Sequence, residues 1–365
     1  MRESVWTGGR VFRDKRGEGP MLLARQVLTV ALKGPGGIGL RKGGARKRQS
    51  GSLLPMRKKS EAQGGAGPRE QKLHEPVMVQ EVLDLLAVGE GGLYVDGTLG
   101  SGGHAEAILR KGGSGVKVLG IDRDPEALLR ARERLAIFGD RLIVRRGSYA
   151  QLRLFLEELG YSRARGVLLD LGASYEQLTS PTRGFSFRER APLDMRFDPD
   201  RSELTAHQIV NFWSQEAIEE LIRRNGQEPL ASRIARSIVR NRPIKDTHHL
   251  AQIVSRVVPR RGRIHPATRV FQALRIEVNQ ELDHLRKAMD SIPPCLEEGG
   301  RMCVIAYHSL EDGIVKRAMK GLASRDPSFQ ILTPKPLRPK PEEVSRNPSA
   351  RSARLRALVR GAEGG

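Results

Sequence analysis

The chain has 365 residues, of which 38% are hydrophobic, enough for about two domains with buried cores. Its 63 lysines and arginines outnumber 42 acidic residues, and the net charge of +21 favours a polyanionic partner such as nucleic acid. No apolar run reaches the roughly 18 residues that cross a bilayer, so we expect a soluble, cytoplasmic protein without a membrane partner. The two cysteines, Cys295 and Cys303, lack metal or redox spacing and are expected to be small core residues.

Residues 1–72 are expected to form a disordered basic extension. They hold 17 lysines and arginines against 5 acidic residues, are rich in glycine and show no sustained periodicity. Three interpretations stay open. The start site is assigned too early, with Met56 as the true start; the segment is an RNA-binding arm; or it is an organellar transit peptide, typically rich in arginine and poor in acids.

A glycine-rich loop between a short strand and a helix indicates a nucleotide-binding site. The predicted strand Leu93–Asp96 and helix Ala105–Lys111 flank four glycines, Gly97, Gly100, Gly102 and Gly103. Glycines let the backbone turn sharply and admit a ligand to the amides at a helix N-terminus. The next predicted strand, Lys117–Ile121, is followed by Asp122, placed about 20 residues on, where a carboxylate meets a ribose in such folds.

Two cofactors fit this loop. The pattern Gly100-x-Gly102-x-x-Ala105 satisfies a relaxed dinucleotide fingerprint, whereas Asp96-x-x-x-Gly100-x-Gly102 is similar to loops that bind S-adenosylmethionine. Asp96 favours the second, because a carboxylate repels a pyrophosphate but attracts the cationic sulfonium and ammonium groups of S-adenosylmethionine. A nucleotide-binding oxidoreductase that uses NAD stays open as an alternative of a different class.

Strands and helices alternate over the first part of the fold. Further helices are predicted over Val77–Leu86, Pro125–Ala136 and Ala150–Leu159, and further strands over Leu142–Arg146 and Gly166–Asp170. This alternation predicts a doubly wound parallel sheet. Asp170 ends the fourth strand, at the edge where open α/β sheets hold their chemistry. Asp124 is expected to cap the helix that begins at Pro125.

After the fourth strand the alternation stops for about a hundred residues, and helices are predicted instead. They cover Leu204–Asn211, Ser214–Arg224, Pro229–Arg240, Thr247–Val258 and Pro266–Met289, with Ser214 and Thr247 as N-caps. In the last of these, apolar residues recur every three or four positions from Phe271 to Met289 and predict one buried stripe.

The strand pattern then resumes. It predicts a strand over Arg301–Tyr307, a helix over Glu311–Lys320 and a closing antiparallel pair, Phe329–Leu332 with Arg354–Val359. We therefore expect a Rossmann-like sheet domain formed by residues 73–180 and 286–361, interrupted by a helical substrate-recognition domain at 181–285. The segment Pro334–Pro341 is either a stiff loop that touches RNA or a plain hairpin connection.

The inserted helical domain is predicted to bind RNA. From Arg233 to Arg275 there are 11 lysines and arginines and a single acid, Asp246. Ordinary solvated surfaces mix charge signs, so this one-sided segment favours a phosphate track. Its candidate residues lie on one helix face and in one tight loop: Arg233, Arg236, Arg240, Arg260, Arg261 and Arg263.

Further motifs follow in order: Gly166-Val-Leu-Leu-Asp-Leu-Gly172, Arg183-Gly-Phe-Ser-Phe187, Pro192-Leu-Asp-Met-Arg196, His265-Pro-Ala-Thr-Arg269 and His308-Ser-Leu-Glu-Asp312. With the glycine loop, they make residues 74–360 resemble the bacterial 16S ribosomal RNA cytosine-N4 methyltransferase family (RsmH, also called MraW). The chain departs from that family at Ser174–Thr179, which reads Ser-Tyr-Glu-Gln-Leu-Thr in place of Ser-Ser-Pro-Gln-Leu-Asp. It also has Tyr307 where the family usually has Phe.

The resemblance implies a class I S-adenosylmethionine-dependent methyltransferase that acts on the N4 amine of one cytidine in 16S ribosomal RNA, within the small subunit. It places cofactor contacts at Gly102, Gly103, His104, Asp122, Tyr149, Asp170 and Gln177. The amides of the first three would face the methionine carboxylate, Asp122 would accept both ribose hydroxyls, and Tyr149 would stack on adenine.

Catalytic roles are harder to assign. Asp170, with Ser174 or His308, is a candidate to hold the protons of the target amine. Asp170 as a cofactor-orienting residue, and His308 as the residue that closes a strand, are the competing interpretations. No metal site is expected. Methylation of another RNA or DNA amine, and a non-catalytic role in ribosome assembly, stay open beside the oxidoreductase.

Overall fold

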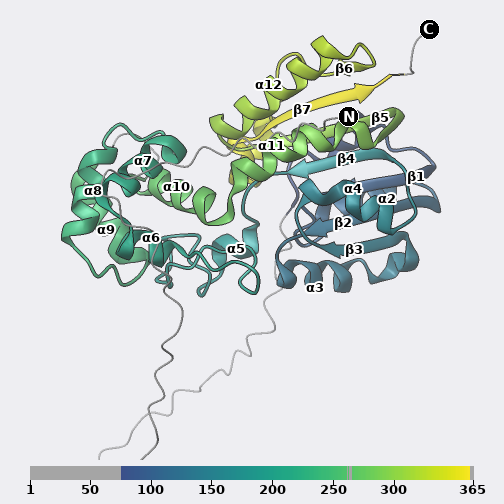
Figure 1. The fold of residues 1–365 in the computed structure, drawn as a ribbon. Coiled ribbons are helices and arrows are strands. Elements are labelled where there is room, and N and C mark those ends of the chain that lie inside the picture. The colour runs from purple at the N-terminus through teal and green to yellow at the C-terminus, as the bar shows by residue number, and fades with distance from the viewer. Residues whose placement is uncertain (1–74, 261, 263–264, 362–365) are drawn as a thin grey trace, which may run out of the picture. The chain divides into compact units, whose positions relative to one another are not determined.

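The computed structural model describes residues 75–260, 262 and 265–361, so the predicted extension 1–72 and the candidates Arg261 and Arg263 lie outside the described residues. The described chain forms a seven-stranded sheet in the order β3-β2-β1-β4-β5-β7-β6 (Figure 1). Its strands are β1 Gly91–Asp96, β2 Gly115–Asp122, β3 Leu142–Arg146, β4 Ala164–Asp170, β5 Leu296–Ala306, β6 Phe329–Ile331 and β7 Arg354–Arg360.

The sheet is parallel from β3 to β5, and β7 is antiparallel to both of its neighbours. Its winding reverses between β1 and β4, and in open α/β sheets such a switch point leaves a ligand crevice at the carboxyl ends of the strands. Asp96, Asp122 and Asp170 are the last residues of β1, β2 and β4, so all three finish at this edge. The predicted doubly wound sheet and its closing antiparallel pair are confirmed.

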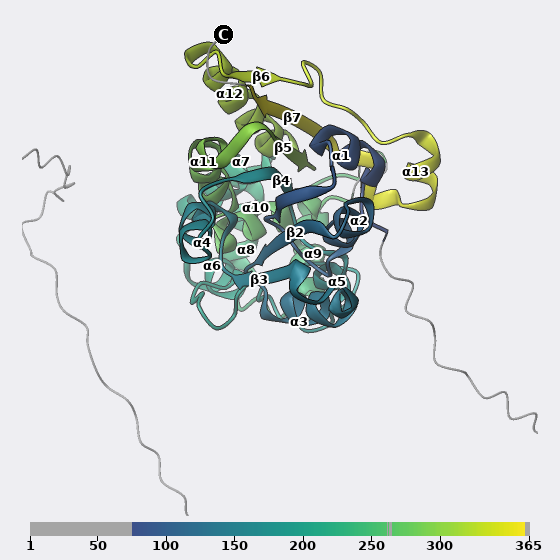
Figure 2. The same ribbon diagram turned by 90° about the vertical axis from the view of Figure 1, so that its right-hand side faces the viewer.

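Helices cover both faces of the sheet, which is why its strands are continuous apolar runs such as Val167–Leu169. One face carries α4 Leu152–Glu158, α11 Glu281–Ser291 and α12 Ser309–Arg325. The other carries α1 Val79–Leu86, α2 Gly103–Lys111 and α3 Pro125–Arg134. Figure 2 shows α4 and α11 on one side of the strands and α1 and α2 on the other.

The helices inserted between β4 and β5 build a hydrophobic core of their own, from Phe185 to Val278. A short α5, Tyr175–Thr179, leads to α6 Ala206–Phe212, α7 Gln215–Gly226, α8 Ala231–Arg240, α9 Thr247–Val257 and α10 Thr268–Asn279. Ser214 caps α7 as predicted, because its side chain accepts from the Ala217 N–H. The domain limits 181 and 285 stay a prediction. The separate core of the inserted helices supports them, because Val278 still packs in that core whereas Leu282 already packs against the sheet.

The prediction of one helix over Pro266–Met289 is wrong. The chain breaks between α10 and α11 at Gln280, which has a left-handed φ of 51°. The predicted apolar stripe is therefore divided between two cores. Its first half packs among the inserted helices, through Phe271, Leu274 and Val278, and its second half packs on the sheet, through Leu282, Leu285 and Met289.

The prediction of Thr247 as an N-cap is also wrong. Its hydroxyl is buried, donates to the Glu189 carbonyl at 2.7 Å and accepts from the Ala191 N–H at 3.0 Å. Because the preceding loop takes this hydroxyl, Asp246 caps α9 instead, accepting from the His249 N–H at 2.8 Å.

The chain between β6 and β7 returns across the end of the sheet. Leu337 forms an isolated antiparallel bridge with Leu355, and α13, Pro341–Arg346, follows. Both cysteines are buried and free, as predicted. None of the helices in the described ranges is long and apolar enough to cross a membrane.

Candidate active site

The glycine loop joins a carboxylate to backbone amides at the ends of β1 and β2. Asp122 Oδ2 accepts from the Gly100 N–H at 2.8 Å, and its Oδ1 accepts from the Asp124 N–H at 2.9 Å. Desolvation raises the pKa of Asp122 above its ordinary value, although both amides oppose the rise. Gly100 has a φ of +51°, a left-handed conformation that glycine adopts without strain. The loop and the carboxylate therefore hold each other in place.

The N-terminus of α2 supplies two of the three predicted amide donors. The first N–H groups of a helix have no carbonyl partner within it, which leaves the Gly103 and His104 amides for a ligand. The Gly102 N–H instead donates to the Leu99 carbonyl at 2.8 Å. The turn that leads into the helix thus uses the Gly102 amide, and a contact of Gly102 with the cofactor stays a prediction. Gly103 and His104 stay predictions.

Asp170, at the end of β4, is held on three sides. Its N–H donates to the Thr98 hydroxyl at 2.6 Å, and the Tyr307 hydroxyl donates to its Oδ1 at 2.8 Å. His104 Nε2 lies 3.4 Å from Asp170 Oδ2. Tyr307 thus has a polar contact that the usual Phe of the family lacks. The sequence showed that Tyr307 departs from the family pattern, but it did not show that the Tyr307 hydroxyl bonds to Asp170.

Asp96 and His104 are buried beside Asp170, and we call these three side chains with Tyr307 the Asp170 cluster. Burial raises the pKa of Asp96 to about 6, although the charge of His104 opposes the rise. Burial alone would lower the pKa of His104, but its hydrogen bond with Asp170 and the charges of Asp170 and Asp96 raise it overall. The site therefore combines carboxylates with an imidazole that favours its charged form.

Gln177 and Arg183 connect the inserted segment to the sheet through Asp124. Asp124 is fully buried, and it caps α3 as predicted by accepting from the Glu126 N–H at 3.0 Å. Its Oδ2 also accepts from Gln177 Nε2 at 2.8 Å and from an Arg183 guanidinium nitrogen at 3.0 Å. The sequence motif that begins at Arg183 was noted, but this role was missed, because the partner lies 59 residues away.

Within the described residues, neither Ser174 nor His308 forms a hydrogen bond or ion pair with Asp170. Ser174 caps α5, where its hydroxyl accepts from the Gln177 N–H at 3.2 Å. His308 caps α12, and its Nε2 lies 3.1 Å from Glu311 Oε1. Burial alone would raise the pKa of Glu311, but His308 lowers it below its ordinary value. The structure shows capping roles, and the catalytic roles stay predictions.

Tyr149 lies against the glycine loop. It follows β3 in a short 3-10 turn, and a Cβ added to Gly97 would come within 2.9 Å of the Tyr149 Cβ. Burial raises the pKa of the Tyr149 hydroxyl, and the negative charges of Glu281 and Glu311 raise it further. This position is consistent with an aromatic wall beside a bound nucleoside. Stacking on adenine stays a prediction.

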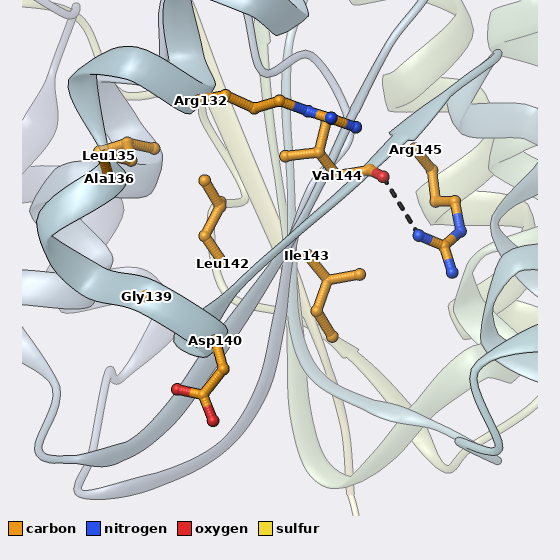
Figure 3. A pocket seen from close by; sticks show the side chains of 9 residues that line it. All are labelled: Arg132, Leu135, Ala136, Gly139, Asp140, Leu142, Ile143, Val144 and Arg145. Atoms are coloured by element: carbon orange, nitrogen blue, oxygen red, sulfur yellow. Dashed lines mark hydrogen bonds between the residues drawn. The ribbon is translucent and has the colours of Figure 1, made fainter.

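A shallow hollow of about 490 Å³ lies elsewhere in the sheet domain, at the edge strand β3 (Figure 3). Its lining comes from the end of α3, the following 3-10 segment Ala136–Arg141, and β3, and includes Arg132, Leu142 and Arg145. None of the candidate site residues named above lines this hollow, so it is separate from the candidate site.

Part of the predicted phosphate track lies on the exposed face of α8. Arg233, Arg236 and Arg240 are exposed, while Ile234 and Ile238 face the core. These three arginines have no hydrogen-bonded or ionic partner in the described part of the chain, and Arg260 is likewise exposed. Other basic residues of the segment serve the fold: Arg242 donates to the Val210 carbonyl, Arg269 pairs with Glu228, and Arg275 pairs with Glu281.

The model of the MraW methylase family matches residues 71–360. The chain belongs to this family. A ribosomal RNA small subunit methyltransferase H from Thermomicrobium roseum is 46% identical over 310 residues, covering 80% of this chain and 95% of the relative. Proteins of the same name from Dehalococcoides mccartyi and a Synechococcus strain are 45% and 46% identical, covering 79% and 80% of this chain and 86% and 92% of theirs.

Solved structures are matched only distantly. An rRNA methylase from Streptococcus thermophilus has a TM-score of 0.37 and 14% identity, and the match covers 76% of this chain and 93% of that one. The fold assignment therefore rests on the strand order of this chain and on its membership of the MraW methylase family.

Membership of the MraW methylase family makes the protein a methyltransferase with S-adenosylmethionine as its cofactor, which removes the NAD-dependent alternative. The donor set fits that group. Asp122 keeps a free lone pair on each carboxylate oxygen for a pair of hydroxyls. The amides of Gly103 and His104 suit a carboxylate, and the neighbouring Asp96 suits a cation.

Proposed function

We propose that this protein transfers a methyl group from S-adenosylmethionine to the exocyclic N4 amine of a cytidine in small-subunit ribosomal RNA. The observation that carries the proposal is the pair of strand-end carboxylates of Asp122 and Asp170, each of which accepts hydrogen bonds from the protein, beside the glycine loop. Asp122 suits the nucleoside part of the cofactor. Asp170, two strands away across the switch point, suits the reacting amine.

The chemistry required of the protein is modest. When bound, S-adenosylmethionine supplies a methyl group on a sulfonium that needs no further activation. The cytosine amine is a poor nucleophile, because its lone pair is delocalised into the ring. The protein must therefore exclude water, orient the amine and accept its protons.

Asp170 is placed to accept those protons. Its Oδ1 accepts from the Tyr307 hydroxyl, and its Oδ2 lies near His104 Nε2. Each carboxylate oxygen has more than one acceptor position. One position on either oxygen is therefore left for an amine N–H. Burial alone would lower the pKa of His104, but its contact with Asp170 raises it, and the two side chains orient one another. Asp170 then takes the proton that the nitrogen releases after methyl transfer.

The target base must leave its stack to reach this site, since its amine is engaged when paired. The exposed arginines of α8 would hold the neighbouring backbone, because guanidinium groups bind phosphates and these have no acidic partner among the described residues. The relatives named above act on small-subunit ribosomal RNA by name, and this supports the same class of substrate here.

The test is to incubate the full chain with small-subunit RNA and methyl-labelled S-adenosylmethionine, and to identify labelled nucleosides by mass spectrometry. N4-methylcytidine is the expected product, from naked RNA or from assembled subunits. Asp170→Asn should lose most of the turnover, whereas Asp140→Asn, an exposed carboxylate remote from the site, should keep it. Label on any other base, or no label from either substrate, would refute the proposal.

A further inference from the structure

A second basic surface lies on the sheet domain, apart from the inserted helices. We call it the C-terminal basic surface, and it consists of Lys316, Lys320, Lys335, Arg338 and Lys340, all exposed. The two lysines of α12 line a hollow of about 270 Å³ together with Met319, Ile331 and Pro334. Pro334 begins the loop that carries the other three cations, so the helix and the loop form one continuous feature.

The charges of this surface are unbalanced. None of its five side chains has a hydrogen bond or ion pair with another described residue. The one acid between Gly313 and Pro341, Asp326, bonds to Ser328 instead. By contrast, three exposed arginines elsewhere in the same domain are matched by acids on their own helix: Arg110 by Glu106, Arg153 by Glu157 and Arg286 by Asp283. Unmatched cations of one sign favour a polyanionic ligand.

Strand register places the loop at the catalytic edge. Asp170 pairs with Ile305, Ile305 pairs with Leu355, and Leu355 bridges to Leu337 between Lys335 and Arg338. Leu337 is thus three strand spacings from Asp170, or about 14 Å at roughly 4.8 Å per spacing. A cation at that distance is within reach of the nucleotides that flank a base held at Asp170.

The chain then leads from the surface to the rim of the site. α13 begins one residue after Lys340, and its Glu343 accepts from the Met78 N–H at 2.7 Å. Asn347, which follows α13, donates to the Glu75 carbonyl at 2.9 Å, and the neighbouring Pro76 lies against Gly103 at the start of α2. α13 therefore lies near the end of the sheet that carries His104 and Asp170. A ligand on the C-terminal basic surface therefore approaches the cluster from the sheet domain rather than from α8. Figure 1 and Figure 2 both show α8 and α12 apart.

We propose that the C-terminal basic surface binds the phosphate backbone of the substrate RNA beside the target nucleotide, so that RNA is held by the sheet domain as well as by α8. This inference rests on the proposed function and deepens it. RNA is favoured over an acidic protein because the strand register places Leu337, in the loop of this surface, three strand spacings from Asp170. Lysine ammonium groups, which are compact point charges, suit phosphates without requiring a particular base sequence.

The experiment measures the affinity for small-subunit RNA over a range of salt concentrations. Two double variants each remove two charges, Lys316→Gln with Lys320→Gln and Lys335→Gln with Lys340→Gln. The matched control is Lys111→Gln with Lys117→Gln, exposed lysines at the end of α2 and near the start of β2, away from the catalytic edge. Each test pair should lower the slope of log affinity against log salt by about 1.4, and the four changes together by about 2.8, at roughly 0.7 per contact.

The control pair should leave the slope and the turnover as they are, and calorimetry should show unchanged S-adenosylmethionine affinity in every variant. Unchanged slopes in both test pairs would overturn the inference. Intact binding to naked RNA with weakened binding to assembled subunits would also overturn it, in favour of an acidic protein partner. Turnover by the unaltered chain is measured first. If it methylates no cytidine, the proposed function fails; if it does, unchanged slopes refute this surface alone.

Discussion

Replacing Asp122 by Asn tests the geometry of the cofactor loop most directly. An amide resembles a carboxylate in shape, so Asn would normally be the mild substitution. Here both carboxylate oxygens already accept a backbone N–H, from Gly100 at 2.8 Å and from Asp124 at 2.9 Å. The NH2 group of Asn must face one of these two backbone N–H groups. Two hydrogen-bond donors then face each other, and one of the two bonds is lost. We therefore expect Asp122→Asn to be as damaging as Asp122→Ala.

The expected loss is that of charge-assisted hydrogen bonds, about 1.5–3 kcal/mol, or roughly a 10- to 150-fold weaker affinity for S-adenosylmethionine. Isothermal titration calorimetry measures the affinity, and thermal melting by circular dichroism checks the fold. Asp140→Asn removes the same charge from an exposed position at the far end of β3 and should bind normally. Affinity within twofold of the unaltered protein for Asp122→Asn would refute the reasoning.

Three further outcomes follow from the structure. Burial raises the pKa of Asp96 to about 6, so the protonated side chain stabilises the fold at low pH, and this stability is lost as the pH rises through 6. Asp96→Asn should therefore stabilise the protein in urea unfolding by on the order of 3 kcal/mol at pH 8, but hardly at pH 4. Arg183→Met leaves the buried Asp124 carboxylate without its cation and should destabilise the fold by about 3 kcal/mol, with a less than additive effect when combined with Asp124→Asn; strict additivity would mean that the pair is not coupled. Replacing the exposed α8 arginines by Gln should lower the salt slope of RNA binding by about 2–3 units while cofactor affinity stays unchanged, and loss of thermal stability instead would indicate a structural role for Arg233, Arg236 and Arg240.

The sequence alone determined the features that depend on neighbours along the chain. Alternating strands and helices predicted the doubly wound sheet, because the repeat of apolar residues distinguishes the two elements within a few positions. The glycine loop and Asp122 were predicted from their spacing, and the exposed face of α8 from arginines three and four positions apart. The ordered motifs also identified the family, since they span almost the whole described chain.

Only the tertiary structure decided which groups meet across long separations. Tyr307 donates to Asp170 over 137 residues of sequence, and Arg183 reaches Asp124 over 59. The break at Gln280 also escaped prediction, because an unbroken apolar repeat does not reveal that its two halves face different cores. Local patterns report what a segment buries. The partner of a buried polar group depends on tertiary packing, because a buried polar group is stable only when it forms a hydrogen bond with a group that the fold places beside it.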